Sequence, residues 1–230
     1  DTMKYCTFNC IYCECGLTDL DQDKRAKLYT TPEILAALDD RFKELHEKKL
    51  HPDNITFAGN GEPTIHPGFA EIIDRTIELR DIYFPTAKIT VLSNSTKLNK
   101  KSVHDALLKI DHNVLKLDAG SEQMFNAINR PLSPIKLKDV VEQLKSFNGN
   151  VIIQTLFVRG RIKGEIIDNT TEEEIALWLR HLEEIKPSLV MLYSISRETP
   201  EEGLVKISAD ELEQIAEKVR QINLDVEVYN

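Results

Sequence analysis

Cysteine is scarce in this sequence and confined to one short segment. The four cysteines fall within residues 6–15 of the 230, and no apolar run is long enough to cross a membrane. A secreted disulfide scaffold spreads its cysteines to join distant segments, so this clustering excludes such a scaffold and favours a metal site. The start of the sequence also lacks the pattern of a signal peptide, so we expect a cytoplasmic protein.

Basic residues are in the minority. The chain has 29 Lys and Arg against 38 Asp and Glu, a formal net charge of −9. This balance argues against a broad phosphate-binding surface, although it leaves room for a local basic pocket. No linker, low-complexity tract or shift in composition divides the chain. We therefore expect one domain over residues 1–230 rather than two small ones.

The pattern of apolar residues predicts alternating helices and strands. Helical spacing occurs at 30–49, 69–77, 103–108, around 124, 136–147, 175–182 and 212–222. Short β-branched or apolar runs predict strands at 54–57, 88–92, 114–117, 151–158, 189–195 and 224–229. Capping boxes are predicted at Thr171 with Glu174 and at Ser208 with Glu211. The alternation predicts an α/β fold with a parallel sheet and outer helices, either a barrel or a doubly wound sheet.

Polar clusters follow five of the expected strands. They occupy residues 59–64, 93–95, 118–121, 159–161 and 194–197. Each cluster by itself is also explained by an ordinary turn. Because α/β proteins bind ligands at the carboxyl ends of their strands, the set as a whole predicts a binding site along that edge.

Three of the cysteines have the spacing Cys6-x3-Cys10-x2-Cys13, with Tyr12 directly before the last. Three thiolates from one short loop can hold a cubane iron–sulfur cluster and leave one iron for another ligand. The alternative is structural zinc, but such sites usually take ligands from two separated knuckles. Cys15 lies only two residues beyond Cys13, so we interpret it as a bystander thiol.

The cysteine spacing with its aromatic residue resembles the cluster signature of the radical S-adenosylmethionine (radical SAM) superfamily. Residues 57–64, Phe-Ala-Gly-Asn-Gly-Glu-Pro-Thr, are similar to that family's glycine-rich motif for the SAM amino group. Within the superfamily the chain resembles compact iron–sulfur oxidoreductases related to wyosine-forming tRNA-modifying enzymes and glycyl-radical-enzyme activases. The resemblance implies a single radical SAM core domain with the fold of a partial (β/α)6 TIM-like barrel.

Family barrels begin with a strand that leads into the cysteine loop. The five residues before Cys6 cannot supply that strand. Two alternatives follow from this departure. Either the first strand precedes Asp1, or the barrel is more open than usual.

The resemblance also implies roles for individual residues. Cys6, Cys10 and Cys13 would bind three irons of a [4Fe–4S] cluster, and the SAM amino and carboxylate groups would chelate the fourth. Around SAM, the Tyr12 backbone would lie near the adenine, and Tyr193 and Ile195 would contact the adenine. The amino group would be bound by Gly59, Gly61 and Glu62, and the carboxylate or ribose would lie near Ser93, Asn94, Lys116 and Asp118. The pocket would also be lined by Gln154 and Arg159. From the residues alone, Ser93, Asn94 and Asp118 are equally interpreted as helix caps.

The implied chemistry is reductive cleavage of SAM to a 5′-deoxyadenosyl radical, which abstracts a hydrogen atom from a substrate. An external one-electron reductant such as flavodoxin or ferredoxin would supply the electron. The acidic charge favours a small molecule or a protein over tRNA as substrate. The alternative is a non-catalytic iron–sulfur or zinc-binding module with a regulatory role, which predicts a fully ligated metal and no affinity for SAM.

Overall fold

The computed structural model describes residues 5–17 and 28–229. Contacts within the chain divide it into two compact units. The first unit comprises Asp1–Cys6, Asp19–Ser93 and Lys97–Asn113, and the second comprises Thr7–Thr18, Asn94–Thr96 and Val114–Asn230. The expected single domain over residues 1–230 stays a prediction.

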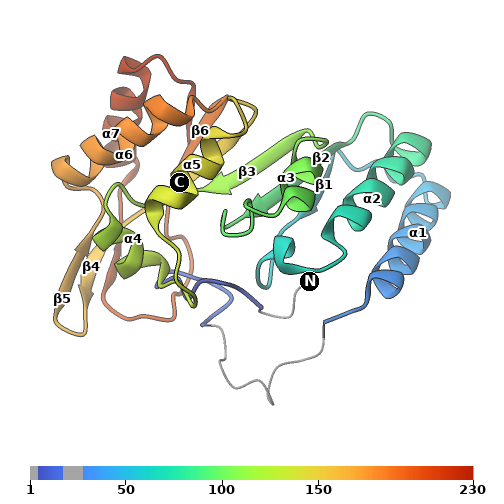
Figure 1. Cartoon of the computed structure of the whole chain (residues 1–230), viewed down its shortest axis with the longest axis horizontal. Coiled ribbons are helices and arrows are strands. Elements are labelled where there is room, and N and C mark those ends of the chain that lie inside the picture. Colours follow the sequence, from blue (N-terminus) through green and yellow to red (C-terminus); the bar gives the residue numbers. More distant parts are fainter. Residues whose placement is uncertain (1–4, 18–27, 230) are drawn as a thin grey trace. The chain divides into compact units, whose positions relative to one another are not determined.

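Two parallel strands and their helices form the first unit (Figure 1). Its elements are α1 (Thr31–Glu47), β1 (Asn54–Phe57), the 3-10 turn η2 (Pro63–Ile65), α2 (Phe69–Tyr83), β2 (Lys88–Ser93) and α3 (Lys101–Leu107). Thr30 begins α1 with a complete capping box to Glu33. Helix α1 packs against α2, and Phe42 of α1 enters a buried cluster with Leu79 and Phe84.

The second unit contains the remaining elements. They are the end of β3 (His112–Lys116), then α4 (Glu122–Asn129), α5 (Leu137–Lys145), β4 (Ile152–Ile162), β5 (Glu165–Asp168), α6 (Glu172–Ile185), β6 (Leu189–Ser194), β7 (Leu204–Lys206), α7 (Ala209–Gln221) and β8 (Val226–Val228). Strands β3, β4, β6 and β8 pair in parallel in that order. The expected α/β alternation with parallel strands is thus confirmed.

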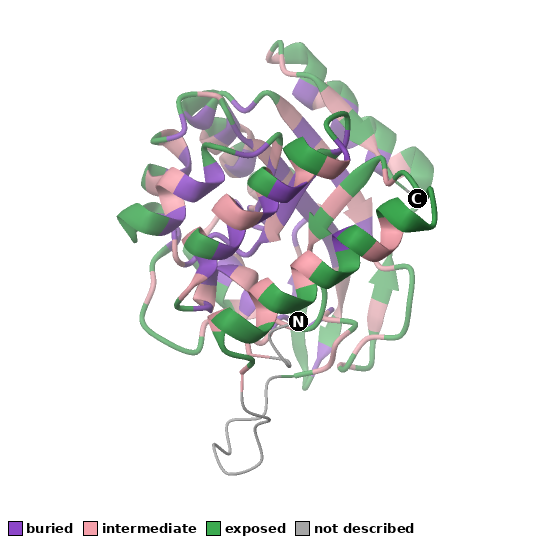
Figure 2. Cartoon of the chain, turned by 90° about the vertical axis from the view of Figure 1, so that its right-hand side faces the viewer, coloured by how far each residue is buried: buried purple, intermediate pink, exposed green. Residues whose placement is uncertain are grey.

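Helix α6 shows how the apolar pattern places a helix on the sheet. Its buried residues recur every three or four positions, and they are Ile175, Trp178, Leu182 and Ile185. The indole of Trp178 meets the ring of Phe157 in β4 edge to face, with centroids 5.3 Å apart. Figure 2 shows the same alternation of buried and exposed residues along the helices. No helix in the described ranges has the length and apolarity that a membrane span needs.

Strand β4 is longer than its apolar run predicts. Residues 159–161 were expected to follow the strand, but they lie within it and pair antiparallel with β5 and β7. The cause is a hairpin turn at Lys163 and Gly164, both with positive φ (52° and 91°). This turn returns the chain along β4, so the cluster at 159–161 is strand rather than loop.

The two predicted capping boxes have different outcomes. Ser208 and Glu211 form the complete box at the start of α7. At α6 the prediction is only half right, because Thr171 caps the backbone of Glu174 while the Glu174 carboxylate turns elsewhere. It accepts hydrogen bonds of 3.1 Å from the backbone N–H groups of Gly120 and Ser121. Tertiary donors thus compete successfully for this side chain.

Candidate functional site

In the second unit, the part of the cysteine loop that follows Cys6 is fixed by backbone hydrogen bonds. The N–H of Cys13 donates to the carbonyl of Cys10 at 3.1 Å, which closes a turn within the motif. The N–H of Ile11 donates to the carbonyl of Ile128 at 2.9 Å, near the end of α4. Cys10, Ile11 and Tyr12 are buried. The loop is therefore held against α4 as a structured segment of this unit.

The four cysteines, all in the described part of the chain, form no disulfide. Cys10 is buried, and the other three are half-buried. Within residues 5–17 and 28–229, no three His, Cys, Asp or Glu side chains converge as closely as a single metal ion requires. The thiolates of a cubane cluster bind separate irons, so their sulfur atoms lie farther apart than the ligands of a single metal ion. Three cysteine thiols in one short loop are the donor set that such a cluster takes.

A buried polar network lies next to this loop. The Tyr12 hydroxyl donates to Asp118, whose carboxylate also accepts from the Leu156 N–H at 2.9 Å. The ammonium of Lys116 donates to the Tyr12 hydroxyl at 3.0 Å and to the Tyr193 hydroxyl. It also lies 4.7 Å and 5.1 Å from the centroids of the two rings. Four residues expected from the sequence are thus brought together: Tyr12, Lys116, Asp118 and Tyr193.

Charge balance explains how Lys116 is accommodated. Burial by itself lowers the pKa of a lysine, but the Asp118 carboxylate, Tyr193 and Cys10 favour the ammonium form. Their effect prevails, and the pKa of Lys116 is raised above its usual value. Burial and the Asp118 charge also raise the pKa of Tyr12 well above 10.0. Lys116 is therefore a cation and Tyr12 a neutral hydrogen-bond donor.

Asp118 is not a helix cap. Ser121 caps α4 instead, by accepting from the N–H of Met124 at 3.1 Å. Asp118 is only 2% exposed, and it reaches across to β4 through Leu156. The interpretation of Asp118 as a cap is thus wrong, because its carboxylate is committed to the buried network.

Strand register decides which other expected residues share the face of Lys116. Lys116 pairs with Gln154, and Gln154 pairs with Met191 in the next strand. Paired residues in a sheet lie on one face, and side chains alternate along each strand. Gln154 and Tyr193 are therefore on the Lys116 face. Ile195 is half-buried just beyond the end of β6.

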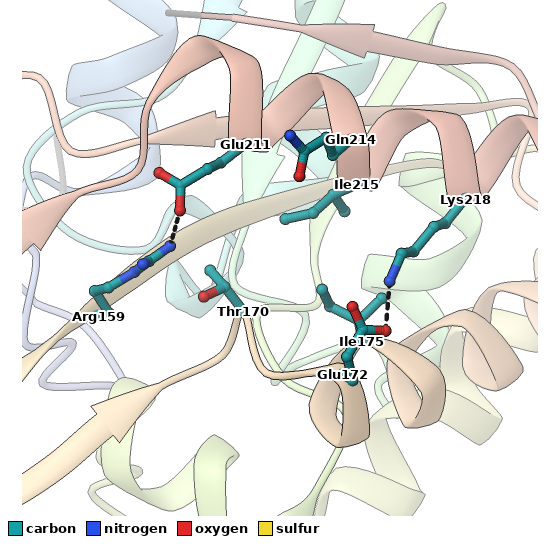
Figure 3. Close-up of a pocket in the computed structure, with 8 residues that line it drawn as sticks. All are labelled: Arg159, Thr170, Glu172, Ile175, Glu211, Gln214, Ile215 and Lys218. Carbon is teal, nitrogen blue, oxygen red and sulfur yellow. Dashed lines mark hydrogen bonds and ion pairs between the residues drawn. The ribbon is translucent and has the colours of Figure 1, made fainter.

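Arg159 does not join this group. It lies five residues beyond Gln154, so the alternation places it on the other face of β4. Its guanidinium forms an ion pair with Glu211 of α7 and lines a small cavity (Figure 3). Lys218 and Glu172 form a second ion pair there. Gln154 and Arg159 therefore lie on opposite faces of β4, and their expected roles at one SAM pocket stay a prediction.

In the first unit, Glu62 is 2% exposed and follows Gly59 and Gly61, which have φ angles of 113° and 108°. One carboxylate oxygen of Glu62 accepts from the N–H and hydroxyl of Thr64, at 3.0 Å and 2.5 Å. The same oxygen accepts from the Ser93 hydroxyl at 2.8 Å. A side chain on Gly59 would meet no described atom within 4 Å, so the chain leaves space above this turn. Glu62 is therefore a fixed buried carboxylate.

Asn94 lies in the second unit and does not cap a helix. Its side-chain oxygen accepts from the N–H and hydroxyl of Thr96, at 3.1 Å and 2.8 Å. Its side-chain nitrogen donates to the hydroxyl of Thr7 at 2.9 Å. Helix α3 begins after Lys100 instead. The cap interpretation of Ser93 and Asn94 is thus wrong, and Asn94 ties the start of the cysteine loop to residues 94–96.

Two buried asparagines of this network were missed by the sequence analysis. Asn129, at the end of α4, donates to Asp118 at 2.8 Å and to the sulfur of Cys10 at 3.5 Å. Asn169 donates to the carbonyls of Asp118 and Leu156, at 2.9 Å and 2.8 Å. The local signal is weak: each asparagine lies one or two residues after an apolar residue, an arrangement that turns provide as often.

Known proteins resemble this chain over most of its length. It is 28% identical to the protein named GTPase Obg of Brachyspira hyodysenteriae over 98% of the chain, but this is 31% of that protein. It is 31% identical to a UPF0026 protein of Synechocystis sp. over 85% of the chain and 68% of that protein. The chain spans about a third of the Brachyspira protein and 60% of a similar UPF0026 protein from Methanocaldococcus jannaschii.

A solved structure and a family model agree with the fold. A radical SAM methyltransferase from Sphaerobacter thermophilus has a TM-score of 0.67 and 16% identity, over 98% of this chain and 63% of that one. This likeness confirms the expected partial TIM-like barrel fold. Superfamily members use a [4Fe–4S] cluster and SAM. Because residues 2–170 match the model of the Radical SAM superfamily, and the Synechocystis relative is a UPF0026 protein, the chain belongs to the radical SAM superfamily and to the UPF0026 proteins.

Proposed function

We propose that this chain is a radical SAM enzyme whose cluster is held by Cys6, Cys10 and Cys13. The observation that carries the proposal is the cysteine loop itself. Three described cysteines that form no disulfide occur in one loop, which backbone hydrogen bonds and the Tyr12–Asp118 contact hold in place. When bound, a reduced [4Fe–4S] cluster supplies the electron that splits SAM into methionine and a 5′-deoxyadenosyl radical, which abstracts hydrogen from the substrate.

The residues of the chain would bind and orient SAM. Glu62 is a buried carboxylate with fixed geometry, suited to accept hydrogen bonds from the methionine amino group. Lys116 is a buried cation that two tyrosine hydroxyls hold in position. Such a cation suits the SAM carboxylate or a ribose hydroxyl. The aromatic rings of Tyr12 and Tyr193 beside it would keep water from the reactive groups.

The electron would come from an external one-electron reductant such as flavodoxin or ferredoxin. The substrate is a small molecule or a protein rather than tRNA, because the formal net charge of −9 disfavours a polyanion. We also propose a cytoplasmic location, since clustered thiols stay reduced there. Arg159 belongs to a separate ion pair and is left out of the proposed SAM site.

Anaerobic reconstitution with iron and sulfide tests the proposal. With a strong reductant and SAM, the chain should form 5′-deoxyadenosine, measured by chromatography. Cys10→Ala should abolish both the cluster absorbance and the product. Cys15→Ala is the matched control and should retain both, because Cys15 lies outside the signature.

The alternative is a non-catalytic iron–sulfur or zinc-binding module with a regulatory role. It predicts a chain that binds metal but neither binds SAM nor forms 5′-deoxyadenosine. Binding of stoichiometric zinc in preference to iron, or a reducible cluster with no product from SAM, would favour this alternative. The glycine-rich motif that contains Glu62 is similar to the family's motif for the SAM amino group, and this similarity supports the enzyme.

A further inference from the structure

Asn129 connects the cysteine loop to the buried network. It is the last residue of α4 and is 2% exposed. Its side-chain nitrogen carries two hydrogens, and each has an acceptor. One is the Asp118 carboxylate at 2.8 Å, and the other is the Cys10 sulfur at 3.5 Å. An N–H to sulfur bond is longer than one to oxygen because sulfur is larger.

The Asp118 carboxylate determines which way this amide points. An ionised carboxylate only accepts hydrogen bonds, so the Asn129 side chain must present its nitrogen rather than its oxygen. Asp118 is itself held by the backbone N–H of Leu156 at 2.9 Å. The nitrogen of Asn129 is therefore oriented by a group that does not depend on the cysteine.

The backbone of Asn129 fixes the distance to Cys10. Its carbonyl accepts from the N–H of Asn9 at 3.1 Å, and the neighbouring Ile128 carbonyl accepts from Ile11 at 2.9 Å. These bonds flank Cys10 on both sides. Arg130 then ends α4 in the left-handed conformation, with φ 45°. The side-chain hydrogen bond to Asp118 and the main-chain hydrogen bonds of residues 128 and 129 therefore both hold the Asn129 amide next to the Cys10 sulfur.

We propose that Asn129 is a positioning residue that donates a hydrogen bond to the cluster-bound thiolate of Cys10 and raises the reduction potential of the cluster. This inference rests on the proposed function, because it requires a cluster at Cys10. A hydrogen bond to a ligand sulfur stabilises the reduced cluster, which carries the additional negative charge. The same bond fixes the orientation of the thiolate and slows loss of iron.

The chain provides a variant without the donor and a matched control. Asn129→Leu keeps the volume but removes both hydrogens. Asn169→Leu removes an equally buried asparagine of the same network, whose nitrogen donates to two carbonyls. Both variants perturb the surroundings of Asp118, but only the first removes the bond to sulfur. A merely structural role for Asn129 predicts the same outcome for both.

The measurement is a redox titration of the reconstituted cluster without SAM, followed by electron paramagnetic resonance. Asn129→Leu should shift the potential to a more negative value than the wild type and Asn169→Leu. Iron release to a chelator should be roughly 10-fold faster in the same variant. Equal potentials in wild type and Asn129→Leu would overturn the inference.

A second measurement needs no variant. In wild-type chain labelled with ¹⁵N at the asparagine side-chain nitrogens, pulsed paramagnetic resonance of the reduced cluster should detect a coupled ¹⁵N nucleus. Its absence overturns the inference even if Asn129→Leu does not fold. A wild-type chain that binds no cluster would overturn the proposed function as well. A cluster that shows the expected coupling but yields no 5′-deoxyadenosine would overturn the proposed function alone.

Discussion

The hydroxyl of Tyr12 donates a hydrogen bond to the carboxylate of Asp118 and thereby links the cysteine loop to the segment after β3. The two residues are 106 positions apart in the sequence, and both are buried. Asp118 keeps two further donors, Asn129 and the Leu156 N–H. The contact therefore joins the cysteine loop to the sheet, and two other hydrogen bonds also hold the carboxylate.

Removing this hydroxyl should destabilise the second unit. Tyr12→Phe deletes a hydrogen bond to a buried charged group, which costs about 1.5–3 kcal/mol. Urea unfolding followed by the fluorescence of Trp178 measures the effect, because this residue is the single tryptophan of the chain and is 1% exposed. Tyr29→Phe is the control, since Tyr29 is 53% exposed. Equal unfolding midpoints for the two variants would contradict the prediction.

Glu62 should matter for stability as well as for SAM. Glu62→Ala leaves the N–H and hydroxyl of Thr64 and the hydroxyl of Ser93 without this acceptor, at a cost of about 1–3 kcal/mol. Glu62→Gln retains an acceptor oxygen and should therefore lose less stability than Glu62→Ala. Urea unfolding followed by circular dichroism compares them, with the exposed Glu71→Ala as control. If Glu62→Ala unfolds at the wild-type midpoint, the carboxylate does not stabilise this turn.

Gly120 allows α6 to approach the segment after β3. A Cβ at this position would lie 2.3 Å from the Glu174 carbonyl oxygen and 2.6 Å from the Trp178 nitrogen. Both are backbone atoms that cannot rotate away, so Gly120→Ala should cost about 3 kcal/mol. Gly164→Ala is the comparison. A Cβ at Gly164 would meet no described atom within 4 Å, but the φ of +91° strains any residue other than glycine, so this variant should lose about 1–2 kcal/mol of stability. A smaller loss at Gly120 than at Gly164, measured by urea unfolding, would show that α6 can shift.

The ion pair of Glu201 with Arg130 should give a pH-dependent contribution to stability. The hydrogen bond from Arg130 lowers the pKa of Glu201 from 4.5. The unfolded chain therefore takes up this proton at a higher pH than the folded chain. The stabilisation is present above the unfolded pKa and is lost as the pH falls through the lowered value.

Glu201→Gln tests this dependence. The variant should be less stable than wild type by up to about 1 kcal/mol at neutral pH. The difference should shrink as the pH falls below 4.5 and disappear below the lowered pKa of the folded chain. Urea midpoints at a series of pH values provide the measurement. The neighbouring Glu202 is exposed, and Glu202→Gln serves as control. A difference that persists unchanged in acid would assign the effect to packing rather than to charge.

The sequence by itself determined the order of the elements and the identity of the family. Apolar spacing located α1, α6 and α7, because a helix must bury one stripe of side chains wherever it packs. The complete capping box at Ser208 was predicted because its two residues are three positions apart and need no tertiary partner. The cysteine spacing and the Gly59–Gly61–Glu62 turn indicated the family for the same reason, since each motif is local.

Only the tertiary structure decided where long-range polar partners lie. The Glu174 carboxylate does not complete the predicted capping box because it accepts hydrogen bonds from the N–H groups of Gly120 and Ser121, which lie more than fifty positions away and need an acceptor. Arg159 and Gln154 were separated by the alternation of a strand whose full length depends on the hairpin after it. Asn129 lies beside Cys10 because two segments that are 119 positions apart in the sequence pack against each other. Burial makes such partners obligatory, but local sequence does not specify which residues they are.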